Sequence, residues 1–294
     1  MKYIRPVSDL HLNFDYDMFH KTRRYTPGEI EVTAMDMLWY PPELPEDDDT
    51  ALVIAGDLWT DRRFLTKKHQ VTNRSWMGEV ASRFKYVVFV LGNHDYWSGN
   101  VSNEAQRVQE ELDLQELTNV HLLESSLIVL DQVKFVGGTL WTDFGNQNPL
   151  VMLRAPQIMN DYDKMRYGKD YGRCRPYHLY DIFNKTKDFI FKNALRDSPD
   201  QKVVVVTHMA PSYQSIDQYY RENCDGSNFL YYSDIEPELH DPEGAQINLW
   251  LHGHCHAKSN YVVNNTHIID NPRGYRGYEE TFFDDRLLLS VDSL

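Results

Sequence analysis

The stretch YVVFVLGNHD, residues 86–95, joins an apolar run to three consecutive polar side chains. A near-continuous run of valine, phenylalanine and leucine is typical of a strand that is covered on both faces. An amide, an imidazole and a carboxylate in a row contribute little to a hydrophobic core. Their position after Leu91, where the strand should end, therefore indicates that a charged species binds there.

Four more β-rich runs end in polar residues in the same way. They are YIRPVSDLH with Asp9 and His11, TALVIAGDL with Gly56 and Asp57, KVVVVTH with His208, and INLWLHGHCH with His252, His254 and His256. Segments with helical spacing, residues 102–112 and 181–195, lie between some of these runs, and this alternation predicts a layered α/β fold. Residues 120–141 instead read as consecutive strands with turns, which predicts that part of the sheet is antiparallel.

The polar clusters are expected to converge, because ligands of α/β sheets collect at the carboxyl ends of strands. Residues two apart in an extended segment point to one face, which would pair Asp9 with His11 and His254 with His256. Together the clusters offer two carboxylates, one amide oxygen and four imidazoles. These donors are Asp9, His11, Asp57, Asn93, His208, His254 and His256.

Mixed nitrogen and oxygen donors suit divalent ions such as Mn²⁺, Fe²⁺, Ni²⁺ or Zn²⁺. Seven donors are too many for one such ion, but they fit two ions about 3.5–4 Å apart that share a bridging carboxylate. We expect Asp57 to be the bridge. Such a pair activates a water molecule and neutralises the oxygens of a phosphoryl group.

His94 stands apart from the expected ligands, next to Asn93, and can donate a proton to the departing oxygen of a substrate. Asp95 is expected to hydrogen-bond the other ring nitrogen of His94 and so fix its tautomer. Each residue also has a simpler interpretation, because an Asp or His after a strand is commonly a turn or cap residue. Five clusters in this order, each closing a strand-like run, favour the metal site.

The ordered motifs DLH, GD, GNHD, TH and GHCH resemble those of the calcineurin-like metallophosphoesterase superfamily, and they span nearly the whole chain. The resemblance implies a four-layer α/β/β/α sandwich with a dinuclear centre at the strand ends. We expect one domain over residues 1–294 with mixed sheets, and manganese as the metal among the ions that suit these donors. The resemblance also implies that one ion is held by Asp9, His11 and His256, the other by Asn93, His208 and His254, with Asp57 between them, His94 as general acid and Asp95 behind it.

The sequence departs from the phosphoprotein phosphatases, which continue the second motif as Gly-Asp-x-x-Asp-Arg-Gly and have Gly-Asn-His-Glu as the third. Here the second motif is GDLWTDRR, in which Asp61 and Arg62 lie one position further along the chain than in the phosphoprotein phosphatases. The third motif is GNHD, with aspartate in place of glutamate. The broader group of monoesterases, diesterases and nucleases is therefore favoured. Cys255 is expected to pack away from the ligands, and His252 is left as a group that could lie behind them. The stretch IIDNPRGY, residues 268–275, is expected to be structural.

Two long segments between the motifs are expected to face the substrate, at about residues 142–180 and 212–246. The first carries several basic residues interleaved with tyrosines, and we hypothesise that it is a lid whose Arg166 and Arg173 bind a phosphorylated, nucleotide-like substrate. The simpler alternative is a surface loop with solvated charges. The aromatic residues of the second could either line the site or contact another subunit, and the oligomeric state stays open.

The composition limits the possible functions. The 294 residues are 41% apolar, carry a formal charge of −14 and include three cysteines. This suits a globular cytoplasmic protein without a disulfide framework, and no apolar run approaches the roughly 18 residues of a membrane span. The expected activity is hydrolysis of a small phosphate ester by metal-bound hydroxide. A DNA nuclease is disfavoured by the acidic charge, and a non-catalytic scaffold by the complete ligand set.

Overall fold

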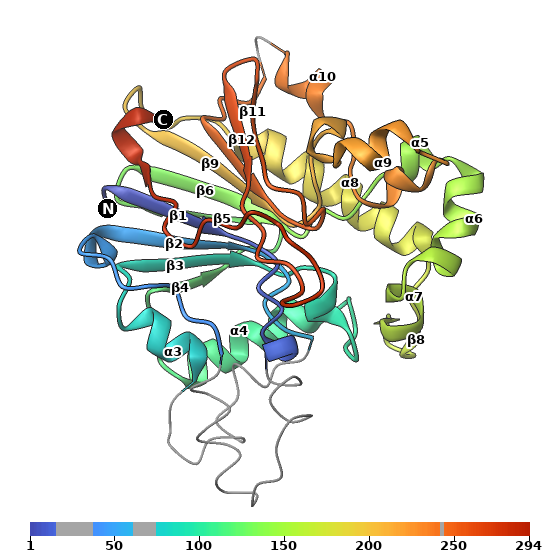
Figure 1. Ribbon diagram of the computed structural model, residues 1–294, viewed down its shortest axis with the longest axis horizontal. Coiled ribbons are helices and arrows are strands. Elements are labelled where there is room, and N and C mark those ends of the chain that lie inside the picture. Colours follow the sequence, from blue (N-terminus) through green and yellow to red (C-terminus); the bar gives the residue numbers. More distant parts are fainter. Residues whose placement is uncertain (16–37, 61–74, 242–243) are drawn as a thin grey trace, which may run out of the picture.

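Two β-sheets lie face to face in the computed structural model, which describes residues 1–15, 38–60, 75–241 and 244–294 (Figure 1). Asp61 and Arg62, which differ in position from the phosphoprotein phosphatase motif, lie outside the described residues. The first sheet has the order β13 (Leu289–Ser290), β1 (Tyr3–Val7), β2 (Thr50–Ala55), β3 (Tyr86–Val90) and β4 (Val120–Leu122). The second has the order β11 (Ser259–Val263), β12 (Thr266–Asp270), β10 (Leu249–His252), β9 (Lys202–Thr207), β6 (Val133–Gly138) and β5 (Ser126–Leu130).

Both sheets are mixed, as predicted. Strands β1 to β4 run parallel to one another, and so do β6, β9, β10 and β12. The outer strands β13, β11 and β5 are antiparallel to their neighbours. The run of strands predicted for residues 120–141 divides between the sheets, because β4 joins the first sheet while β5 and β6 form a hairpin in the second. The parallel strands bring the motif-bearing loops to one edge.

The alternation of apolar side chains in the strands fills the space between the sheets. Val53 of β2 and Val204 of β9 belong to one buried cluster between the sheets. Leu52 and Val205, their sequence neighbours, belong to a second cluster on the outer faces. Because successive side chains of a strand point to opposite faces, each central strand is covered on both sides. This explains the near-continuous apolar runs of the sequence.

Helices cover the outer faces and complete the predicted four layers. Helices α3 (Trp76–Ala81) and α4 (Glu104–Leu114) cover the first sheet, and α8 (Pro176–Asn193) covers the second (Figure 1). Helix α8 begins five residues before the predicted segment 181–195. Pro176 suits a first helical position, and the backbone N–H of Arg175 donates to Nδ1 of His178 at 3.1 Å, which caps the helix earlier.

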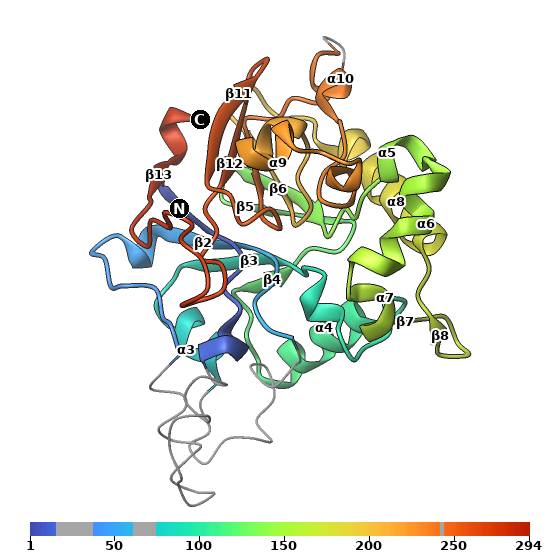
Figure 2. The same ribbon diagram turned by 45° about the vertical axis from the view of Figure 1, so that its right-hand side comes forward.

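Short elements form the rest of the described chain. Helices α5 (Phe144–Gln147) and α6 (Pro149–Ile158) lie side by side (Figures 1 and 2), and both contact η6 (Ser227–Leu230), so the segments 142–180 and 212–246 pack against each other. No helix in the described ranges is both long and apolar enough to cross a membrane. The short elements are η1 (Asp47–Asp49), η4 (His94–Tyr96), α5 (Phe144–Gln147), α6 (Pro149–Ile158), α7 (Asp161–Lys164), β7 (Arg166–Tyr167), β8 (Gly172–Arg173), η5 (Tyr213–Ser215), α9 (Gln218–Glu222), η6 (Ser227–Leu230), α10 (Glu236–Leu239) and η7 (Val291–Ser293).

Candidate metal centre

The expected ligands follow the strands in a strained backbone conformation. Five of them have a positive φ, a region that residues other than glycine rarely adopt and that costs on the order of 1–3 kcal/mol each. The expectation that residues two apart share a face through extended backbone is therefore corrected, because both members of each pair are left-handed. Such strain is found where the surrounding structure requires it. The five residues are Asp9 (φ 51°), His11 (43°), Asp57 (54°), His254 (72°) and His256 (48°).

One group of donors lies between the carboxylates of Asp9 and Asp57. Nε2 of His11 lies 3.1 Å from Nε2 of His256, and Nε2 of His256 lies 3.4 Å from Oδ1 of Asp9. Nε2 of His11 also lies 3.6 Å from Oδ2 of Asp57. Two imidazole nitrogens and two carboxylates thus converge from three loops, although His11 and His256 are 245 residues apart in the sequence.

A second group of donors faces the other side of Asp57. Nε2 of His208 lies 3.4 Å from Oδ1 of Asp57 and 3.0 Å from Oδ1 of Asn93. The other nitrogen of His208, Nδ1, contacts the carbonyl oxygen of Ala55 at 2.8 Å, which turns Nε2 toward the carboxylate. The two oxygens of Asp57 therefore face different donor groups. Within each of three overlapping sets, the ligand atoms lie within 4.8 Å of one another. The sets are Asp9, His11 and His256; His11, Asp57 and His94; and Asp9, Asp57 and His208.

Two further observations indicate that the expected ligands are suited to bind divalent cations. Nε2 of His254 is buried and has no hydrogen-bond partner within the described residues, an arrangement that is costly unless a ligand uses the nitrogen. The chain also keeps space free beside the carboxylates. A Cβ on Gly92 would lie 2.1 Å from Oδ1 of Asp57, and a Cβ on Gly253 would lie 2.7 Å from Oδ2 of Asp9.

The electrostatics of the cluster favour added positive charge. Burial lowers the pKa of His254 to about 3, so this imidazole is neutral and able to coordinate. Burial alone would also lower the pKa of His208 and His256, but the carboxylates of Asp57 and Asp9 outweigh it and raise these pKa values to about 9 and about 11. Two protons thus compensate the buried carboxylates, and metal binding would release such protons.

His94 reaches the cluster, but its expected partner is wrong. Asp95 accepts from the backbone N–H groups of Gly92 at 2.8 Å and Trp59 at 2.9 Å. Nδ1 of His94 has no hydrogen-bond partner among the described residues. The ring of His94 instead stacks on Trp97, with ring centroids 3.8 Å apart. Asp95 therefore fixes the backbone of the loop rather than the tautomer of His94.

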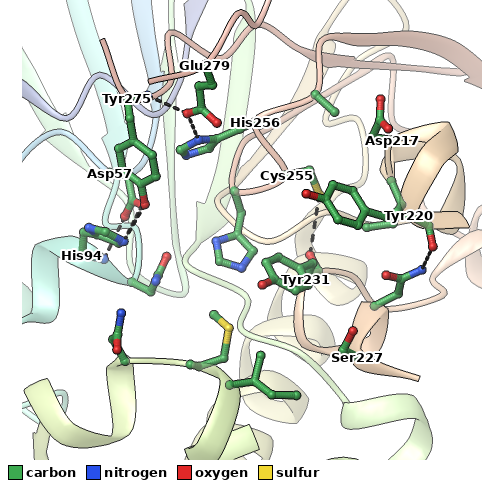
Figure 3. A pocket seen from close by; sticks show the side chains of 18 of the residues that line it. Asp57, His94, Asp217, Tyr220, Ser227, Tyr231, Cys255, His256, Tyr275 and Glu279 are labelled. Carbon is green, nitrogen blue, oxygen red and sulfur yellow. Dashed lines mark hydrogen bonds and ion pairs between the residues drawn. The ribbon is translucent and has the colours of Figure 1, made fainter. Parts of the chain in front are cut away.

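Three residues that the sequence did not single out support the centre. Oδ1 of Asp161 accepts from Nδ2 of Asn93 at 2.8 Å and from Nε1 of Trp97 at 3.2 Å. Oε1 of Glu279 lies 2.5 Å from Nδ1 of His256, and the hydroxyl of Tyr275 lies 3.3 Å from Nε2 of His94 (Figure 3). None of Asp161, Glu279 and Tyr275 belongs to a motif at a strand end. The stretch IIDNPRGY, residues 268–275, contains Tyr275, but the sequence predicts only a structural role for it.

A pocket of about 580 Å³ opens over the cluster (Figure 3). The segment 142–180 contributes residues 158–161 to its wall, and the segment 212–246 contributes Tyr220 and Tyr231 among others. Arg166 and Arg173 do not line it. They stand opposite each other in the β7–β8 hairpin, where Arg166 donates to the carbonyl oxygens of residues 163 and 165. No lysine or arginine belongs to the described lining.

The two residues left open near the last motif are placed by packing. Cys255 packs against the small apolar cluster that contains Tyr232, and it also lines the pocket wall. His252 is fully buried, and its Nε2 lies 2.9 Å from Oγ of Ser215 while its Nδ1 lies 3.1 Å from the carbonyl oxygen of Gly253. It therefore ties the segment 212–246 to the loop that carries His254.

Known proteins share both the sequence pattern and the fold. An uncharacterised protein of Acanthamoeba polyphaga mimivirus is 25% identical over 306 residues, which cover 100% of this chain and 98% of that protein. The crystal structure of phosphopantetheinyl hydrolase from Mycobacterium tuberculosis matches with a TM-score of 0.61 at 14% identity, covering 98% of this chain and 95% of that chain. A structure from Thermus thermophilus matches with a TM-score of 0.50 at 11% identity, covering 99% and 95%. At such identities the structures show the fold alone.

The family of this chain is established by its sequence pattern. The pattern of the calcineurin-like phosphoesterases matches residues 7–258, a range that begins within β1 and includes every expected ligand. The match accounts for the two stacked sheets and for the position of the donors at the strand ends. The chain therefore belongs to the calcineurin-like phosphoesterase family and is a metal-dependent phosphoesterase.

Proposed function

We propose that this enzyme uses two divalent ions to hydrolyse the ester of a small phosphorylated substrate. Asp9, His11 and His256 would hold one ion, and Asn93, His208 and His254 the other. The observation that carries the proposal is the placement of Asp57, whose Oδ2 faces His11 at 3.6 Å while its Oδ1 faces His208 at 3.4 Å. One carboxylate between two donor groups is what a pair of like-charged ions needs.

When bound, the ions would activate water and neutralise charge on the phosphoryl group. The protein's own contribution is to hold their ligands in place. The backbone N–H of His94 donates to Oδ1 of Asp57 at 2.9 Å, and the N–H of His254 donates to Oδ1 of Asp9 at 3.0 Å. These bonds fix both carboxylates at the strand ends. Manganese is our preferred metal for such mixed donors.

His94 would donate the proton that the departing oxygen needs. Its Nε2 lies 4.0 Å from Oδ2 of Asp57, so it borders the donor cluster, and its ring lines the pocket. Stacking on Trp97 fixes the plane of the ring. A proton donor held beside the reacting group typically contributes about 10²–10⁴ to the rate.

The pocket supports a small substrate. Its far wall carries the rings of Tyr220 and Tyr231, which could contact a flat leaving group such as a nucleoside. The described lining has acidic members, including Asp217 and Glu280, and it offers no cationic side chain for a second phosphate. We therefore favour an ester with a single phosphate as substrate.

The free state of Cys174, Cys224 and Cys255 supports a reducing, cytoplasmic setting.

Two variants and a pair of chromogenic substrates test the proposal. The purified enzyme should contain about two manganese ions per chain and should release nitrophenol from the mono- or bis-ester of nitrophenyl phosphate, which separates monoesterase from diesterase. His94→Ala should keep its metal and lose turnover by about 10²-fold or more. Asp57→Ala should lose both metal and turnover. Undiminished turnover in His94→Ala, or full metal content in Asp57→Ala, would contradict the assigned roles.

A further inference from the structure

The segment after β12 lies beyond the family match, which ends at residue 258, yet it returns to the metal centre. The backbone N–H of Arg273 donates to the carbonyl oxygen of Ser8 at 3.0 Å, and the N–H of Gly274 donates to that of Asp9 at 3.0 Å. Gly274 has a φ of 68°, and a Cβ there would lie 2.6 Å from Oε1 of Glu279. The turn is thus fastened to the loop that carries the first ligands.

This fastening places the ring of Tyr275 against the expected ligands. Its centroid lies 4.5 Å from that of His11 and 4.7 Å from that of His256. The ring also packs on Phe14, with centroids 4.7 Å apart. Both Tyr275 and Glu279 line the pocket (Figure 3), and the N–H of Tyr275 donates to Oε1 of Glu279 at 2.6 Å. These contacts hold the ring with its hydroxyl toward the pocket.

The hydroxyl of Tyr275 points at the nitrogen that would carry the catalytic proton. It lies 3.3 Å from Nε2 of His94. Two donors about 3.3 Å apart can both reach one oxygen at ordinary hydrogen-bond distances of about 2.7–3.0 Å. The hydroxyl of a tyrosine is a hydrogen-bond donor, so the side chain of Tyr275 can donate to such an oxygen.

We propose that Tyr275 is a catalytic residue that donates a hydrogen bond to an oxygen of the phosphoryl group, on the side where His94 protonates the leaving oxygen. The inference rests on the proposed function. Tyr275 gives up no proton; its hydroxyl stabilises charge that develops on the oxygen during cleavage. Because the described pocket lining has no lysine or arginine, this neutral donor would be a main contact of the protein itself with the phosphoryl oxygens.

Tyr275→Phe tests the proposal by removing one oxygen atom while keeping the ring that packs on His11 and Phe14. The variant should retain the metal content of the unmodified enzyme and lose kcat by about 10²-fold, as for other preorganised donors. Its affinity for inorganic phosphate, measured by calorimetry on the metal-loaded protein, should fall about tenfold, as expected for the loss of one hydrogen bond to a charged group. Tyr278→Phe is the matched control, because Tyr278 belongs to the same segment and is 72% exposed.

The outcomes separate this proposal from the function on which it rests. Unchanged kcat and unchanged phosphate affinity in Tyr275→Phe would overturn it, even if His94→Ala and Asp57→Ala behave as expected. Loss of metal from Tyr275→Phe would also overturn it, because the hydroxyl would then support the centre rather than the substrate. If no ester is hydrolysed by the unmodified enzyme, the proposed function fails, and the phosphate measurement still decides whether Tyr275 contacts the phosphoryl group.

Discussion

Glu279→Gln should weaken the metal centre through one imidazole. Oε1 of Glu279 lies 2.5 Å from Nδ1 of His256 and so keeps Nε2 of that ring turned toward Asp9, 3.4 Å away. A carboxylate behind a ligating histidine orients the ring and raises its basicity, and the loss of such a partner typically costs about 10–100-fold in metal affinity or activity. The glutamine keeps an acceptor oxygen of the same size but removes the charge.

The structure places the expected effect within that range. A hydrogen bond to a charged group contributes about 1.5–3 kcal/mol. The side chain of Glu279 is 33% exposed, so solvent screens part of its charge. We therefore expect about 1.4 kcal/mol for Glu279→Gln, which is roughly a tenfold loss of manganese affinity. Glu279→Ala also removes the acceptor for the N–H of Tyr275, and it should approach the upper limit of about 100-fold.

Competition with a fluorescent chelator for manganese measures the affinity directly and does not depend on turnover. Glu280→Gln is the matched control, because it removes the same charge from the next residue, whose carboxylate accepts from the N–H of Phe282 instead. The expected order of affinity is control, then Glu279→Gln, then Glu279→Ala. An equal loss in Glu280→Gln would show that general pocket charge is responsible, and no loss in Glu279→Ala would refute the orienting role.

Three further substitutions test the site. Gly92→Ala would place a Cβ 2.1 Å from Oδ1 of Asp57 and should abolish metal retention in the folded protein; full metal content by elemental analysis would contradict the steric argument. Asp161→Ala removes the acceptor of Asn93 Nδ2, so with limiting manganese the metal content should fall below that of the unmodified enzyme, and an identical titration would count against it. Arg166→Ala should leave KM unchanged, because its guanidinium donates to nearby carbonyl oxygens; a rise of about tenfold, or roughly 1.4 kcal/mol, would restore the lid hypothesis.

The strands and the convergence of the motifs could be predicted because their signals are local. The apolar run of residues 86–90 and the polar residues after it are adjacent in the sequence, and the parallel arrangement brings such strand ends together. The sheet to which a short strand belongs is not a local property. Residues 120–122 read like the strands that follow them, yet β4 pairs with β3, whereas β5 and β6 form a hairpin.

Adjacency misled the assignment of Asp95. The sequence places it next to His94, but both residues lie in the short helix η4, where consecutive side chains point in different directions. The carboxylate turns back and accepts from the N–H of Gly92, three residues earlier. The clustering of Arg166 and Arg173 in the sequence predicted a shared ligand; the two residues lie in the β7–β8 hairpin and are not among the described residues that line the pocket.

The residues that we propose to act beside the metal ligands are hard to predict for a further physical reason. The expected metal ligands directly follow strands, so the sheet fixes them and the sequence marks them. Tyr275 and Glu279 are instead fixed by a backbone hydrogen bond between Gly274 and Asp9, which lie near opposite ends of the chain, and no local pattern records such a contact. The ligands are therefore marked by local sequence, whereas the groups that orient a ligand, such as Glu279, or that lie beside it, such as Tyr275, depend on contacts between distant parts of the chain.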